Sequence, residues 1–175
     1  MILSTPSVYA NPTGAQIVNG QVSIDSSTPG VMNITNSPNA IVNWQEFSIG
    51  QNEVTQFIQQ SSQSAVLNRV IGQNPSEILG QLISNGHVFL LNPNGIVFGA
   101  NSIINTQGLI ASTLNLTDED FLSGNYHFSA SNNAGDIVNE GIIRTGGDGN
   151  IILIAPNIEN NGIFKLLFNN FNNCF

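Results

Sequence analysis

Short apolar segments of strand length recur along the chain, and each is bounded by Gly, Asn, Pro or Ser. Ile, Val and Phe favour strands, whereas the flanking residues favour turns. No apolar run approaches the ~18 residues of a membrane-spanning helix, so we do not expect a membrane-embedded protein. The predicted strands are QIVNGQVSI (16–24), VMNI (31–34), AIVNW (40–44), HVFLL (87–91), GIVFG (95–99), IVNEGII (137–143) and NIILIA (150–155).

One segment, NPSEILGQL (74–82), has the pattern of a short helix. Asn74 is a candidate N-cap, Pro75 occupies the first helical position, and Glu77 occupies the third. These residues predict a helix of one or two turns.

A second segment, TDEDFLSG (117–124), predicts another short helix. Thr117 is the candidate cap, three acidic residues fill the first turn, and Gly124 is the stop. The acidic residues therefore mark the start of a helix in this interpretation. A metal cluster is the alternative, but no His or further carboxylate is evidently coupled to them.

A repeat of the form apolar–Asn–x–Gly–apolar–apolar recurs late in the chain, with Gly141 and Gly162 separated by 21 residues. Gly108 lies in a segment of the same shape. A period near 20 with Asn and Gly at the corners predicts the coils of a β-solenoid, in which equivalent Asn side chains can bond along the axis. A β-sandwich with similar turns is the alternative. The three segments are IINTQGLIAS (103–112), IVNEGIIRT (137–145) and NIENNGIFK (157–165).

The segment between the strands at 87–91 and 95–99 has strong turn chemistry. Proline suits the second position of a β-turn because its φ is already close to the required value, and Asn and Gly suit the third and fourth positions. The predicted turn consists of Asn92, Pro93, Asn94 and Gly95.

The composition supports a β protein with many turns and argues against nucleic-acid binding. The 175 residues suffice for one domain with a core, and hydrophobic residues make up 41%. Only 8% of residues are charged, the net charge is −8, and 27 Asn and 17 Gly take the place of charged surface residues. The three cations, Arg69, Arg144 and Lys165, are scattered, whereas binding to phosphates requires clustered Lys and Arg.

No catalytic, metal or cofactor site is expected from the sequence. The chain has two isolated histidines, His87 and His127, and one cysteine, so neither a nucleophilic triad nor a zinc site is indicated. GGDGN (146–150) resembles one defective copy of a calcium-binding repeat, and a tight hairpin turn is the preferred interpretation. Eleven acidic residues could in principle supply a catalytic pair, but nothing in the sequence positions one.

A carbohydrate-binding or carbohydrate-acting β-helix is the alternative function. It would need a cleft with paired carboxylates or stacked aromatic rings, yet the chain has one Trp and two Tyr. Trp44 is therefore expected to anchor the core or the cap of the fold rather than to serve as a platform for a sugar.

An ordered set of segments resembles the secretion (haemagglutination-activity) domain at the N-terminus of filamentous-haemagglutinin-like exoproteins, the TpsA proteins of two-partner secretion. The resemblance runs from about Asn11 to Asn161, and the complete set is specific although any one segment is weak. The segments are NPTGAQIVNGQVSI, IVNWQEFSIGQNEVTQFIQ, SAVLNRVIGQNPSEILGQLISNGHVFLLNPNGIVFG, INTQGLIASTLNLTDEDFLSGNYHF and GDIVNEGIIRT.

The resemblance implies an all-β, right-handed parallel β-helix with extra-helical capping strands and one or two very short helices. It implies a monomeric, non-catalytic domain that directs export of a large adhesin-like or haemagglutinin-like protein to the surface of a Gram-negative bacterium. The partner would be the POTRA domains of an outer-membrane TpsB transporter in the periplasm. The family's NPNG motif maps onto Asn92, Pro93, Asn94 and Gly95. Its NPNL motif is absent as written, and Asn74-Pro75 is the nearest segment.

Three parts of the chain are expected. Residues 1–10 would be a remnant or truncated signal peptide, because Val8-Tyr9-Ala10 resembles a cleavage site without a basic or long apolar region before it. Residues 11–165 would form the secretion domain. Residues 166–175 would be an atypical tail, because the sequence near the C-terminus departs from the solenoid pattern. A truncated gene, a fragment and a frameshifted end are the alternative explanations.

Overall fold

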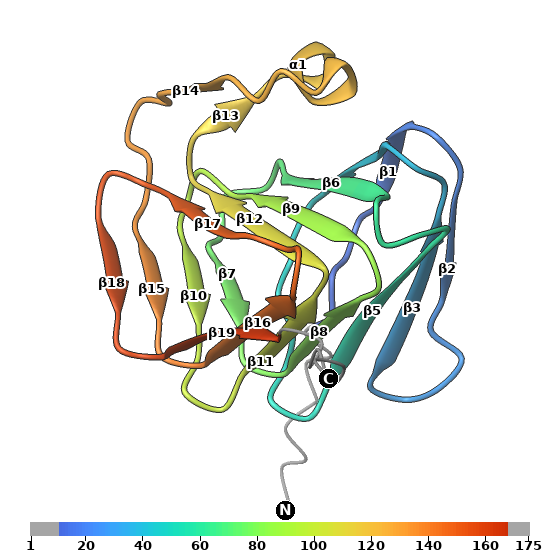
Figure 1. The fold of residues 1–175 in the computed structure, drawn as a ribbon, viewed down its shortest axis with the longest axis horizontal. Helices are drawn as coiled ribbons and strands as arrows, with labels where there is room; N and C mark the ends of the chain where they lie inside the picture. Colours follow the sequence, from blue (N-terminus) through green and yellow to red (C-terminus); the bar gives the residue numbers. More distant parts are fainter. Residues whose placement is uncertain (1–10, 168–175) are drawn as a thin grey trace, which may run out of the picture.

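The computed structural model describes residues 11–167, which form a β-solenoid whose coils contribute strands to three sheets (Figure 1). In order, the six-stranded sheet has β1 (Gln16–Asn19), β4 (Ala40–Trp44), β6 (Ala65–Val70), β9 (His87–Leu91), β12 (Gly108–Ser112) and β17 (Ile151–Ile154). The four-stranded sheet has β18 (Ile158–Asn160), β15 (Ile137–Asn139), β10 (Ile96–Phe98) and β7 (Ser76–Ile78). The seven-stranded sheet has β19 (Ile163–Leu167), β16 (Ile142–Gly146), β11 (Ile103–Thr106), β8 (Gln81–Ser84), β5 (Val54–Gln59), β3 (Val31–Asn36) and β2 (Val22–Asp25).

Stacked apolar side chains fill the space between the three sheets. Leu82 pairs with Ile104 and Ile104 with Ile143, so these three fully buried residues form one ladder across successive coils. Trp44 is 1% exposed and donates from its indole to Asn68 Oδ1 at 3.0 Å. It therefore anchors the core, as the sequence predicts.

The predicted period near 20 residues is confirmed. Ser76 pairs with Ile96 and Ile137 with Ile158, offsets of 20 and 21 residues. Asn139 donates to Asn160 Oδ1 at 2.7 Å, which is the expected bond between Asn side chains along the axis.

Two of the three proposed repeat glycines are equivalent, and the third is not. Gly141 and Gly162 both precede strands of the seven-stranded sheet, and the position of a Cβ on Gly162 would overlap the carbonyl oxygen of Gly141. Gly108 instead begins β12 and pairs with His87, at a different corner. The inclusion of Gly108 in the repeat was wrong because a similar sequence shape occurs at two corners of the coil.

The predicted helix at 74–82 is wrong, because this segment forms β7 and β8. Ser76 and Ile78 pair in parallel with β10, and Ile78 and Leu82 are fully buried in the core. Sheet pairing and burial outweigh the local capping pattern, which by itself would support only a single turn.

The predicted helix at 117–124 is confirmed as α1 (Asp118–Ser123). The side chain of Thr117 accepts a hydrogen bond from the Asp120 backbone, and Gly124 ends the helix in the left-handed conformation with φ 72°. Of the one or two very short helices expected, one is thus present, and α1 is the one helix of the described residues.

The strand predicted at 16–24 is two strands separated by a turn. β1 pairs antiparallel with β4, and β2 pairs antiparallel with β3, at the N-terminal end of the solenoid (Figure 1). These antiparallel strands are the expected capping strands.

At residues 146–150 the predicted turn is present, and the Gly149 amide donates to the Gly146 carbonyl oxygen at 2.9 Å. The predicted hairpin there is wrong, because β16 and β17 belong to different sheets.

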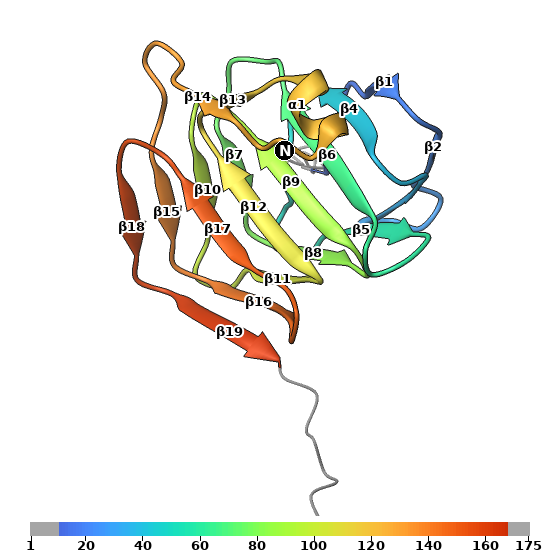
Figure 2. The ribbon, with the colours of Figure 1, turned by 45° about the horizontal axis from the view of Figure 1, so that its top comes forward.

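Residues 113–136 leave the solenoid between β12 and β15, and we call this segment the flap. It contains β13 (Asn115–Leu116), α1 and β14 (Phe128–Ser129), with β13 and β14 paired antiparallel. Figure 2 shows α1 over the end of β6, with β13 and β14 to one side of it. Leu116 and Phe121 of the flap form one apolar cluster with five residues of the six-stranded sheet, Ile41, Ala65, Leu67, Phe89 and Leu91.

Two expectations concern the ends of the chain. The predicted signal-peptide remnant at 1–10 lies outside the described residues. β19 continues through Leu167, two residues into the predicted tail, and residues 168–175 also lie outside the described range.

Candidate functional site

The segment Asn92–Gly95 forms the predicted turn, at the corner where the chain passes from β9 to β10. The Gly95 amide donates to the Asn92 carbonyl oxygen at 3.2 Å, which closes a turn with Pro93 and Asn94 in the middle. Gly95 has φ 118°, a conformation that other residues rarely adopt. The turn sits at a corner between the six-stranded and four-stranded sheets.

Asn92 is fully buried, and its whole side chain is used inside the protein. Its Nδ2 donates to the Asn74 carbonyl oxygen at 3.0 Å and to Ser76 Oγ at 2.9 Å. Its Oδ1 accepts from the Asn94 amide at 2.9 Å and from Asn94 Nδ2 at 3.0 Å. Asn92 is therefore a satisfied buried polar residue that holds the turn, rather than a surface contact.

Asn94 is half-buried and extends the same network to the preceding coil. Its Nδ2 donates to the Gly72 carbonyl oxygen at 2.9 Å and approaches the Asn74 carbonyl oxygen at 3.4 Å. Ser76 in turn donates its amide to the Gly95 carbonyl oxygen at 3.0 Å. Hydrogen bonds therefore run both ways between the turn and the preceding corner, residues 72–76. Asn92 and Asn94 donate to that corner, and Ser76 donates back to the turn.

The second predicted region, Asn74-Pro75, is brought next to the turn, although its residues are exposed. Asn74 Nδ2 donates to Glu46 Oε1 at 2.6 Å. The Asn74 carbonyl oxygen accepts hydrogen bonds from the side chains of Asn92 and Asn94. Sequence reasoning missed the acceptors Gly72 and Ser76. The 20-residue spacing between β7 and β10 is the signal that could have placed them opposite the turn.

On its other side the turn contacts the end of the flap. The Gly135 amide donates to the Pro93 carbonyl oxygen at 2.8 Å, and the Ile96 amide donates to the Asp136 carbonyl oxygen at 3.1 Å. A Cβ on Gly135 would lie 2.6 Å from the carbonyl carbon of Asn94. The turn therefore fixes the point at which the flap rejoins the solenoid, and sequence reasoning did not find this contact.

A second attachment of the flap lies near its start. The Arg69 guanidinium donates 2.7 Å bonds to the Leu116 carbonyl oxygen and to Asp118 Oδ1. Phe121 and Phe89 pack edge to face with ring centroids 5.1 Å apart. Asp118, part of the acidic cluster, is thus half of an ion pair between flap and solenoid.

Among residues 11–167, no group of three or more His, Cys, Asp and Glu could hold a metal ion. Burial lowers the pKa of the His87 imidazole below 6.5, whereas His127 is exposed on the flap. Within the same residues no helix has the length and apolar character needed to cross a membrane.

The sequence of this chain is similar to one family model and to curated proteins. The model of a family described as the TPS secretion domain matches residues 8–166. Two curated heme/hemopexin-binding proteins of Haemophilus influenzae are similar, at 36% identity over 132 residues and 33% over 143 residues. These matches cover 75% and 78% of this chain but 14% and 16% of the relatives, so the chain corresponds to a small part of their length.

A solved structure is also similar. The HMW1 secretion domain from Haemophilus influenzae superimposes with a TM-score of 0.86 at 40% sequence identity. The match covers 89% of this chain and 42% of that one.

Proposed function

The chain belongs to the family of TPS secretion domains, the domains of two-partner secretion exoproteins, and we propose that it is the export signal and folding nucleus of a longer exoprotein. The family is a secretion domain of secreted Gram-negative proteins and not an enzyme family. The partner would be the periplasmic POTRA domains of a TpsB transporter in the outer membrane. The cargo would be a large adhesin-like or haemagglutinin-like protein on the cell surface.

The observation that most supports this proposal is the position of the turn Asn92–Gly95 within a chain matched by the family model over residues 8–166. The turn joins the preceding corner to the end of the flap through side-chain and backbone hydrogen bonds. In the proposal, Asn92 and Asn94 hold the shape of the surface that the transporter recognises. The exposed residues Pro93, Asn74 and Pro75 form the part of this surface that the transporter can contact.

Both ends of the solenoid suit a folding nucleus. The antiparallel strands β1 and β2 cover the N-terminal end, where unpaired strands would otherwise invite aggregation. The last coil exposes apolar side chains on which further coils could stack, each templated by the one before. The exposed residues are Ile158, Ile163, Phe164, Leu166 and Leu167. Low charge is also favourable for a chain that crosses a transporter unfolded.

The proposal is tested by binding and export together. The purified chain should bind the POTRA module of its cognate transporter, and cells should release the chain only when that transporter is present. A Pro93→Ser variant should stay folded, because Pro93 is exposed, but should bind the module less tightly. A matched Pro156→Ser variant changes an exposed proline in a later coil and should bind normally. Release without the transporter would refute the proposed function.

A further inference from the structure

A cleft of about 320 Å³ lies on the outer face of the six-stranded sheet, beside the flap. Its floor is apolar and is formed by side chains from successive coils, among them Ala65, Phe89, Ile110 and Ile152. Ile152 is 39% exposed, because the flap covers the neighbouring part of the sheet but not this part. The volume is at the lower end of the range for small-molecule sites.

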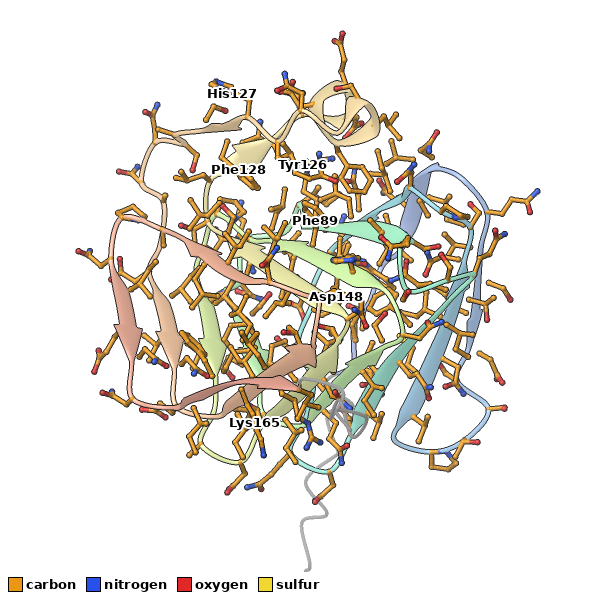
Figure 3. The ribbon with its side chains drawn as sticks, in the orientation of Figure 1. Phe89, Tyr126, His127, Phe128, Asp148 and Lys165 are labelled. Atoms are coloured by element: carbon orange, nitrogen blue, oxygen red, sulfur yellow. The ribbon has the colours of Figure 1, made fainter. Side chains whose placement is uncertain are left out.

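An aromatic side chain forms one wall of this cleft. Tyr126 is 48% exposed, and its ring centroid lies 5.0 Å from that of Phe89 and 6.4 Å from that of Phe121. Figure 3 shows Tyr126 on the flap above Phe89 on the sheet. The two Phe rings hold Tyr126 in place, and the exposed part of its ring offers an aromatic surface to a ligand.

Three polar side chains surround the floor. Gln63, His87 and Asn150 line the cleft, and no described residue forms a hydrogen bond with any of these side chains. Each carboxamide offers both donors and acceptors. Burial lowers the pKa of the His87 imidazole and therefore favours its neutral form, which has one donor and one acceptor.

The lining favours a neutral ligand that brings its own donors and acceptors. Among the described residues that line the cleft there is no Asp, Glu, Lys or Arg, so a charged ligand would find no counter-ion in them. A peptide strand gains most of its affinity by pairing with a free sheet edge, whereas this cleft lies on the face of paired strands. Sugar hydroxyl groups donate and accept without such an edge, and a sugar ring also has an apolar face.

We propose that this cleft binds one ring of a neutral saccharide, with an apolar face of the ring against Tyr126 and its hydroxyl groups bonded to the polar side chains around the floor. A carbohydrate-binding β-helix, the alternative function considered from the sequence, would need a cleft with aromatic rings, and this site is such a cleft. Binding of a saccharide there needs no paired carboxylates. The proposal does not depend on the secretion role, since its ligand and its residues are separate from those of the turn Asn92–Gly95.

The test is an NMR titration of the isotopically labelled full chain with the methyl glycosides of glucose, galactose and N-acetylglucosamine. At least one of them should cause saturable shifts at Tyr126, His87 and Ile152. Asn150→Ala and Gln63→Ala should each weaken this binding at least threefold, and Tyr126→Ala at least tenfold. Asn132→Ala, an exposed position on the flap outside the cleft, should leave it unchanged.

Several outcomes would overturn the proposal. They are the absence of saturable shifts with every glycoside, shifts that map away from the cleft, and equal binding by Asn150→Ala and the parent chain. Tighter binding of galacturonate than of the neutral sugars would also overturn it. Because Tyr126→Ala could release the flap, the two variants in the polar rim decide the test, with unchanged spectra elsewhere as the check on folding. POTRA binding is measured separately, so either proposal can fail alone.

Discussion

Two Asn-Pro dipeptides lie at the same corner of the solenoid, one coil apart, and the structure uses them differently. Asn92 is fully buried and its side chain makes four hydrogen bonds. Asn74 is exposed, and its side chain makes one bond, to Glu46. The first residue holds the corner together with its side chain, whereas the second contributes mainly a backbone carbonyl.

Register explains the difference. Because Ser76 pairs with Ile96, extending the pairing places Asn74 opposite Asn94 and Pro75 opposite Gly95. The Cβ of Pro75 lies 3.7 Å from the position of a Cβ on Gly95, which agrees with this alignment. The two dipeptides are therefore two residues out of step. Position in the coil, and not the dipeptide itself, decides which Asn is buried.

Asn92→Ala should have the largest effect on stability. It removes four hydrogen bonds at a fully buried position and leaves Ser76 Oγ and the Asn94 amide without their partner. We expect a loss of about 3 kcal/mol in the free energy of unfolding, measured by urea denaturation. A loss below about 1 kcal/mol would contradict the role of Asn92 in holding the corner together.

Gly135→Ala should have the next largest effect, and should act mainly on the flap. The added methyl group would lie 2.6 Å from backbone atoms of Asn94, which cannot move aside as a flexible side chain could. We expect a loss of about 2 kcal/mol. Hydrogen exchange should rise across residues 113–136 more than in β9 and β12. As a control, Gly124→Ala also changes a flap glycine, but its Cβ would meet nothing within 4 Å, although its φ of 72° carries a smaller cost.

Asn94→Ala should cost about 1 kcal/mol, because a half-buried side chain loses its bonds to Gly72 and Asn92. This variant also separates two ways in which the turn could serve export. If the variant folds but is not exported, the turn acts through contact with the transporter. If export falls only in proportion to the loss of folded protein, the turn acts through architecture.

Asn74→Ala should have the smallest effect, below about 0.5 kcal/mol, since it removes one exposed side-chain bond and keeps the carbonyl that Asn92 and Asn94 use. The measurement is the same urea denaturation. An effect as large as that of Asn92→Ala would show that the two corners are equivalent and that register does not distinguish them.

Local sequence patterns succeeded where one coil contains all the relevant contacts. The caps of α1, Thr117 and Gly124, act on the same turn of helix that they end, so their pattern was sufficient. The turn at Asn92–Gly95 also closes on itself. The pattern at 74–82 failed because its decisive contacts are with β10 and the core, in other coils.

The residues of the turn could be found from the sequence, but their burial could not. Which Asn points inward depends on the register between β7 and β10. The bond from Gly135 to Pro93 spans 42 residues, including all but the last residue of the flap. The cleft beside the flap could not be found from the sequence for the same reason. Its walls come from residues that are far apart in the chain, Gln63, His87, Tyr126 and Asn150.

By itself the sequence determined the β class, the coil length, the short helix and the turn, because spacing, capping and turn chemistry act over a few residues. Only the tertiary structure decided which Asn-Pro corner is buried, where the flap is attached and which side chains surround the cleft. Those features depend on how separate coils stack and align. Stacking brings together residues 20 or more positions apart, and the repeat gives the length of a coil but not the register in which neighbouring coils align.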